Sequence, residues 1–202
     1  MPSVYGLKPR FQDLLRPAVN GLARAGVTAN QVTVAALVLS LAAGAEIAGT
    51  RGGRTLLLVP VVLFLRMALN AMDGMLAREH GQKSALGAVL NELGDVIADV
   101  ALYLPLALVP GFNARLMVGV VVLAILSEMT GVIAVQIGAS RRYDGPMGKS
   151  DRAFLFGVLA LLLGLGLQVE KAVPWVLIVM LVLLVVTIVN RARGALREVG
   201  AR

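Results

Sequence analysis

Apolar residues fill long segments of this chain, and short breaks rich in polar residues, glycine or proline separate these segments. Six of them lie at about 29–49, 55–77, 85–109, 115–138, 153–169 and 173–190. Each is close to the roughly 20 residues that a helix needs to cross about 30 Å of hydrocarbon. The pattern predicts an all-α integral membrane protein, a single domain over 1–202 with six transmembrane helices within 29–190.

The first 25 residues follow a different pattern. Their apolar residues recur every three or four positions between charged ones, which is the spacing of one helical face. No uninterrupted apolar core precedes a small-residue cleavage site, as it would in a signal peptide. We therefore expect residues 1–25 to form an interfacial amphipathic helix along the membrane surface, kinked or split at Pro17.

Composition and charge refine this picture. Hydrophobic residues make up 58% of the 202 positions and charged residues 15%, which excludes a soluble globular protein. Of the 19 Lys and Arg residues, 14 fall on the side of the two termini, 4 on the opposite side and Arg66 within a span. Short basic loops stay in the cytoplasm, so we expect both termini there, with 191–202 as a basic tail. We interpret the positive charge as a sign of orientation and of contact with membrane lipids, with no nucleic-acid partner.

Acidic residues within the apolar segments are the main candidates for chemistry. Asp73 lies near the cytoplasmic end of the second segment, and Glu92, Asp95 and Asp99 lie in the first half of the third. Charged groups are costly inside a bilayer, so we expect these residues to face a cavity that is open to the cytoplasm. Helical spacing places Asn70 with Asp73, and Asn91 with Asp95 and Asp99, on shared faces. Oxygen ligands without His or Cys suit Mg²⁺ or Mn²⁺, which indicates metal-assisted chemistry on a phosphate ester.

The residues from 70 to 95 resemble the signature of the CDP-alcohol phosphatidyltransferase family. That signature reads D-x-x-D-G-x-x-A-R-x8-G-x-x-x-D-x-x-x-D, and six of its eight defined positions match here. The matching residues are Asp73, Gly74, Ala77, Arg78, Gly87 and Asp95. Thr28-Ala29-Asn30-Gln31-Val32-Thr33 is similar to the T-P-N-x-x-T element of the same family, with Ala29 in place of proline.

The resemblance implies a role for each matched position. Asp95 would be the catalytic base that deprotonates the acceptor hydroxyl, and Asp73, Asn70, Asn91 and Asp95 would hold Mg²⁺ or Mn²⁺. The cytidine diphosphate group would bind at Gly74, Ala77, Arg78 and Gly87. The expected reaction transfers a phosphatidyl group from a CDP-alcohol lipid to an acceptor alcohol and releases CMP in phospholipid biosynthesis. The resemblance also implies a homodimer, and we expect a bacterial inner membrane with the active site facing the cytoplasm.

Two departures from the signature leave alternatives open. Asn70 and Asn91 stand where the family has aspartate, so the site has two fewer negative charges. An asparagine oxygen can still bind Mg²⁺, and Glu92, Asp99 or Glu128 are candidates to supply the missing charge. One alternative is a catalytically altered or inactive relative that acts as a lipid-binding or scaffolding membrane protein. A third hypothesis is a small transporter in which Asp73, Asp95 and Asp99 form a proton or cation path.

The remaining intramembrane charges and one polar loop have more than one interpretation. We expect Arg66 and Glu128 to be structural charge partners, and Asp99 to support the site or form a salt bridge. The loop from 141 to 152 can set topology and touch lipid headgroups. It can equally form a rim that binds the phosphate of a phosphorylated acceptor, through Arg141, Arg142, Lys149 and Arg152.

Overall fold

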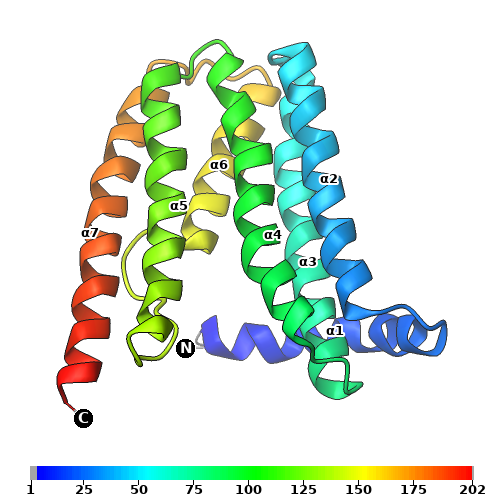
Figure 1. Cartoon of the computed structure of the whole chain (residues 1–202). Coiled ribbons are helices and arrows are strands. Elements are labelled where there is room, and N and C mark those ends of the chain that lie inside the picture. Colours follow the sequence, from blue (N-terminus) through cyan, green and yellow to red (C-terminus); the bar gives the residue numbers. More distant parts are fainter. Residues whose placement is uncertain (1–3, 202) are drawn as a thin grey trace. The chain divides into compact units, whose positions relative to one another are not determined.

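The computed structural model describes residues 4–201, and this part of the chain contains helices and no strand. The helices in chain order are α1 (Val4–Arg24), α2 (Ala29–Thr50), α3 (Leu58–Glu79), α4 (Ala85–Tyr103), α5 (Ala114–Gln136), α6 (Lys149–Gly164) and α7 (Val173–Gly200) (Figure 1). Short 3-10 turns, η1 (Gly53–Leu57) and η2 (Leu104–Leu108), precede α3 and follow α4. The all-α fold is therefore confirmed.

Four stretches of helix are long and apolar enough to cross a membrane. They are α2, η1 together with α3, α5 and α7. The first 18 residues of α4 contain three acidic residues, and α6 has 16 residues, or about 24 Å of helix, which is less than the hydrocarbon thickness. The chain is an integral membrane protein, and the six-span arrangement stays a prediction.

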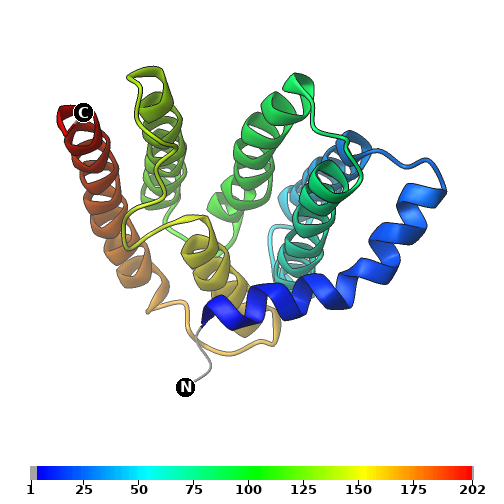
Figure 2. The same cartoon turned by 90° about the horizontal axis from the view of Figure 1, so that it is seen from below.

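Helix α1 is continuous through Pro17, so this proline does not split it. It ends in a Schellman motif, in which Gly26 takes a φ of 76° and the Val27 amide donates to the Leu22 carbonyl at 3.0 Å. Figures 1 and 2 show α1 running across the ends of α2 and α3. Its placement at a membrane surface stays a prediction.

A small apolar core holds α1 to the two helices that it crosses. Val19 of α1 is fully buried with Met75 and Leu76 of α3 and with Ala29 and Val32 of α2. At the edge of this core an ion pair joins Arg16 of α1 to Glu79 at the end of α3. The core therefore fixes the start of α2 beside the end of α3, where the signature residues lie.

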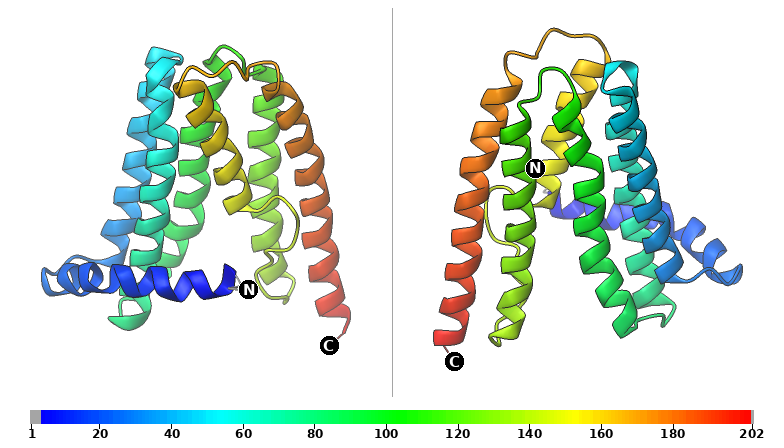
Figure 3. Two further views of the ribbon diagram at one scale, coloured as in Figure 1. Left: turned by 180° about the vertical axis from the view of Figure 1, so that it is seen from behind. Right: turned by 45° about the horizontal axis from the view of Figure 1, so that its top comes forward.

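The helices form two compact units. The first comprises the described residues up to Ala42 together with Val61–Ala98, and the second comprises Ala43–Pro60 together with the described residues from Asp99 onward. In the second unit α5 packs along α7, and α6 packs against η1 (Figure 3). At the second of these contacts a Cβ on Gly164 would lie 2.8 Å from the Leu57 side chain, so glycine permits the close approach.

Helix α7 continues through the segment predicted as a basic tail. It runs without a break to Gly200, and Arg191 lies within it at 1% exposure. Residues 191–200 therefore form part of the packed structure of the second unit.

Candidate functional site

The first unit brings the two halves of the signature together. Helix α3 carries Asn70 and Asp73, a short turn follows, and α4 carries Gly87 and Asp95. The Asn70 side-chain amide donates a hydrogen bond to Asp95 Oδ1 at 3.0 Å. This bond connects the first and the last of the eight compared signature positions, and it shows that the polar faces of α3 and α4 meet as their spacing predicted.

The start of α2 forms a third side of this site. The Thr33 hydroxyl donates to Asp73 Oδ2 at 2.7 Å, and Asp73 is 5% exposed. The Asn30 side chain lies against Gly87, where an added Cβ would be 2.9 Å from Asn30 Oδ1. Thr33 and Asn30 belong to the element that resembles T-P-N-x-x-T, so this element contributes directly to the site.

Gln82 ties the turn between α3 and α4 to the first residues of α2. Its Oε1 accepts from the Ala29 amide at 2.6 Å, and its Nε2 donates to the Val27 carbonyl at 3.4 Å. Thr28 and Gln31 cap the same helix end reciprocally, at 2.8 and 3.2 Å. The sequence analysis did not identify Gln82. Its signal is indirect, because Ala29 provides an amide proton where the family element has proline.

The other predicted positions differ in how far they are buried and in what they contact. Arg78 is exposed, and its guanidinium lies over Gly74, where a Cβ would be 3.0 Å from both terminal nitrogens. Ala77, which precedes Arg78 in the chain, and Gly87 on α4 are half-buried. Asn91 is exposed and has no side-chain hydrogen bond within the described part of the chain. The structure thus joins Asn70, Asp73 and Asp95 to the site through defined contacts, and Asn91 by its place on α4.

The donor set fits a hard divalent cation that is also bound by substrate. Asp73 and Asp95 supply two carboxylates, and the asparagines supply amide oxygens. Among the described residues, no group of three His, Cys, Asp or Glu side chains could hold a metal ion. Mg²⁺ is commonly bound by one or two carboxylates plus phosphate oxygens, which two aspartates can satisfy.

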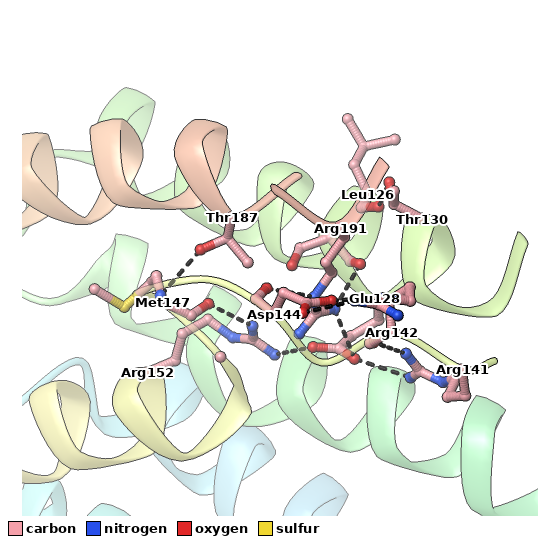
Figure 4. Close-up of polar contacts among 12 residues, drawn as sticks. Leu126, Glu128, Thr130, Arg141, Arg142, Asp144, Met147, Arg152, Thr187 and Arg191 are labelled. Carbon is pink, nitrogen blue, oxygen red and sulfur yellow. Dashed lines mark hydrogen bonds and ion pairs between the residues drawn. The ribbon is translucent and has the colours of Figure 1, made fainter. Parts of the chain in front are cut away.

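The second unit contains an arginine cluster centred on Glu128 of α5 (Figure 4). The Glu128 carboxylate accepts from Arg141 at 3.1 Å and from Arg152 of α6 at 3.2 Å, and it lies 3.3 Å from Arg191 of α7. Arg152 also pairs with Asp99 at 3.2 Å. Glu128 is thus a charge partner, as expected. Arg191 was missed because a charge at the end of an apolar run predicts only a helix boundary.

The loop between α5 and α6 lies along α7 and contacts it from Glu198 back to Thr187. Ser140 donates to Glu198 at 2.7 Å, and Arg142 pairs with the same Glu198 at 3.0 Å. Further along the loop, the Asp144 carbonyl accepts from Arg191 at 3.3 Å. The Met147 amide donates to Thr187 at 3.0 Å.

Ion pairs also fix the predicted rim residues of this loop. Arg142 binds both oxygens of Asp144, at 2.7 and 2.8 Å. These hydrogen bonds lower the pKa of Asp144 and raise the pKa of Arg142. Arg141 lies 4.8 Å from the centre of the Tyr143 ring, and Lys149 begins α6. A phosphate-binding role for the rim stays a prediction.

Comparison with known proteins places this arrangement in a family. The family model described as CDP-alcohol phosphatidyltransferase matches residues 26–192. The chain is 46% identical over 194 residues to "Inner membrane protein YnbA" of Escherichia coli (strain K12), covering 96% of each chain. It is 28% identical over 170 residues to the phosphatidylinositol phosphate synthase of Mycobacterium tuberculosis (strain ATCC 25618 / H37Rv), covering 82% of this chain and 75% of that one.

Two crystal structures of the Mycobacterium tuberculosis phosphatidylinositol phosphate synthase share the fold. The complex with manganese and citrate matches with a TM-score of 0.73 at 22% identity, over 89% of this chain and 87% of that chain. The structure with CDP-DAG bound matches with a TM-score of 0.69 at 22% identity, over 91% and 92%. The family match begins at residue 26, just before α2, ends at residue 192 within α7, and includes every signature position. The chain therefore belongs to the CDP-alcohol phosphatidyltransferase family.

Proposed function

We propose that this protein transfers a phosphatidyl group from a CDP-alcohol such as CDP-diacylglycerol to an acceptor alcohol and releases CMP. The family acts in phosphatidyl transfer for phospholipid synthesis, and one structural neighbour was solved with CDP-DAG bound. The observation that carries the proposal is the site on α2, α3 and α4, where Thr33 anchors Asp73 and Asn70 anchors Asp95.

Asp95 is the base in the proposed reaction. Its carboxylate takes the proton of the acceptor hydroxyl as that oxygen forms a bond to phosphorus, and the bond from phosphorus to the oxygen of CMP breaks. The Asn70 amide holds Asp95 Oδ1 and so orients the carboxylate for this transfer. Gly74, Ala77, Arg78 and Gly87 line the diphosphate side, where Arg78 provides a positive charge.

The family depends on a divalent metal ion, and one neighbour structure contains manganese. In our proposal Asp73 and Asp95, with the amide oxygens of Asn70 and Asn91, hold Mg²⁺ or Mn²⁺. A bound cation of this kind neutralises diphosphate charge and so assists departure of CMP. The hydroxyl of Thr33 holds Asp73 in place for this role.

Release of CMP tests the proposal directly. Reconstituted protein with CDP-diacylglycerol, Mg²⁺ or Mn²⁺ and a panel of acceptor alcohols is expected to release CMP. Asp95→Asn is expected to lower the rate by about 10²–10⁴-fold, the usual contribution of a general base, with folding unchanged. Glu46→Gln, which neutralises an exposed carboxylate of α2 away from the signature, is the control. A folded wild-type protein that releases no CMP across the panel would favour the inactive lipid-binding relative.

We further propose six spans with both termini and the site on the cytoplasmic side, in a bacterial inner membrane, and a homodimeric assembly. Support for α4 as a span comes from its exposed apolar stripe, formed by Leu86, Val89, Leu93 and Ile97. Helix α6 likewise exposes Phe154 and Leu161.

The sequence contains no cysteine, so single-cysteine variants can map this topology. Lys83→Cys, in the turn before α4, is expected to react with a membrane-impermeant maleimide in inside-out vesicles alone. Arg54→Cys is expected to react in right-side-out vesicles. The reverse labelling pattern would contradict the proposed orientation.

A further inference from the structure

Glu128 is enclosed by guanidinium groups from three separate parts of the second unit (Figure 4). Arg141 comes from the loop, Arg152 from α6 and Arg191 from α7, and all three lie within 3.3 Å of the Glu128 carboxylate. Arg152 and Arg191 have side chains that are 1% and 2% exposed. Such convergent guanidinium groups are the usual way in which proteins bind a phosphate or carboxylate.

The cluster therefore has the form of an anion site in which the anion is a side chain of the protein itself. Glycines allow the loop arginines to lie this close. The Arg141 guanidinium covers Gly131 of α5, and Arg142 lies against Gly194 of α7, where a Cβ would be 2.7 Å from its Nη2. Any side chain at either glycine would displace an arginine.

The charges around Glu128 indicate what would replace it. The three arginines contact two carboxylates that are mostly shielded from solvent, Glu128 and Asp99, whose side chains are 14% and 10% exposed. Without Glu128, Arg152 would keep its ion pair with Asp99, and the Asp144 carboxylate would still attract Arg191. Loss of the Glu128 charge would therefore leave a net positive charge among these groups, which a phosphate ester can neutralise because it carries about −1.5 to −2 at neutral pH.

Two buried donors in the same cluster have no hydrogen-bond partner within the described part of the chain. They are Arg152 Nε and the hydroxyl of Ser127, whose carbonyl accepts from Arg191 at 2.6 Å. Buried donors without partners are unfavourable, and an oxygen of a bound ligand would satisfy them. A hydroxyl oxygen is sufficient for this, and it brings no charge to compete with Glu128.

Helix α4 connects this cluster to the proposed chemistry. Asp99, the second partner of Arg152, follows Asp95 by one turn of the same continuous helix, or about 6 Å along its axis. Arg152 is therefore anchored on the helix that carries the proposed base.

We propose that Glu128 sets the class of acceptor: it occupies the arginines as an internal anion, so that the protein takes a polyol without a phosphate group. The proposal rests on the transferase function proposed above. A phosphorylated acceptor would have to displace Glu128 from three arginines, whereas a hydroxyl-bearing acceptor needs only the donors that Glu128 leaves unused.

The first test measures phosphate binding without any reaction. Full-length wild-type protein and the variants Glu128→Ala and Glu128→Gln are purified in detergent, and the melting temperature is followed as inorganic phosphate replaces chloride at constant ionic strength. Glu128→Ala, which removes both charge and volume, is expected to be stabilised by phosphate and to bind it at least tenfold more tightly than wild type. Glu128→Gln keeps the volume and is expected to show a smaller stabilisation. Glu46→Ala, a carboxylate removed from α2, should behave as wild type.

The second test compares acceptors in pairs. Wild-type CMP release is measured with glycerol and glycerol 3-phosphate, and with inositol and inositol phosphate. The unphosphorylated member of a pair is expected to be preferred, and Glu128→Ala is expected to shift the ratio of kcat/KM at least tenfold toward the phosphorylated member. A wild-type preference for phosphorylated acceptors, which needs no variant to detect, would overturn the proposal. So would the absence of phosphate-dependent stabilisation in both Glu128 variants. A lack of CMP release with every acceptor would instead contradict the transferase function, and the phosphate-binding result would still stand on its own.

Discussion

The signature site and the arginine cluster hold their carboxylates in different ways. Asp73 accepts a hydrogen bond from the Thr33 hydroxyl and Asp95 accepts one from the Asn70 amide, and both donors are neutral groups. Glu128 instead lies among three guanidinium groups, of which those of Arg152 and Arg191 are almost completely buried. Around the first site Arg78 and Asn91 are exposed. In the second region an added anion must replace a carboxylate that three arginines already bind.

The largest expected effect is a loss of folding stability when an arginine of the cluster in the second unit is replaced. Arg152→Met removes one ion-pair partner from Glu128 and one from Asp99, and breaking a buried ion pair typically costs about 3–5 kcal/mol. Because Arg141 and Arg191 still contact Glu128, we expect a loss near the lower end of this range. Denaturant unfolding in detergent would measure this loss. Arg142→Met, in the same loop but with partners that are partly exposed, is the control and should cost much less. Equal losses would show that burial does not distinguish the arginines.

A second prediction concerns the anchoring of Asp73. Thr33→Val keeps the shape of the side chain but removes the hydrogen bond at 2.7 Å. Loss of a group that orients a metal ligand typically lowers metal affinity by about 10–100-fold, so Mn²⁺ binding should weaken by this amount while the melting temperature changes little. Thr130→Val removes a comparable hydroxyl, which bonds to the Leu126 carbonyl at 2.7 Å, and is expected to leave Mn²⁺ affinity unchanged.

The two asparagines of the signature should respond differently to restoration of the acid. Asn70→Asp places a second carboxylate at the position that now contacts Asp95, and Mn²⁺ affinity is expected to rise on the order of tenfold. Asn91 is exposed, so Asn91→Asp should have the smaller effect. Calorimetric titration with Mn²⁺ would rank the two variants. A larger gain from Asn91→Asp would mean that the metal lies nearer to α4 than the contacts of Asn70 indicate.

The smallest expected effect is the pH dependence of the loop. Arg142 lowers the pKa of Asp144 in the folded protein, so this pair stabilises the fold fully above the unfolded pKa of about 3.9. The contribution is lost as the pH falls through the lower, folded pKa. Wild type should therefore melt about 2 °C above Asp144→Asn at pH 7, a modest difference because the pair is partly exposed. The difference should shrink as the pH falls below about 3.9, and a difference that grew on acidification would contradict the assigned pairing.

The signature site was largely predictable because its information is local. Spacings of three and four residues place Asn70 with Asp73 and Asn91 with Asp95 on helical faces, and a short turn makes the helices neighbours. Gln82 was not predictable in this way. Its contact with Ala29 spans 53 residues and depends on the angle at which α2 begins.

For the arginine cluster, the sequence indicated charged residues as candidates but did not predict how they pair. Arg141 and Arg152 were expected to face an acceptor phosphate or lipid headgroups, and no periodicity relates them to Glu128 or to Arg191, which is 63 residues beyond Glu128. Pairing of this kind is decided by how α5 packs along α7, and side chains at the ends of apolar runs give no signal of it.

The alignment of the α5–α6 loop with α7 also constrains how the protein is made. Ser140 and Arg142 both bond to Glu198, and Met147 bonds to Thr187. These partners are synthesised about 40 to 58 residues later than the loop residues. The enclosure of Glu128 likewise needs Arg191. A nascent chain that has not yet released the last turns of α7 thus has an unfinished second unit, whereas the contacts of Asp73 and Asp95 need no residue beyond Asp95.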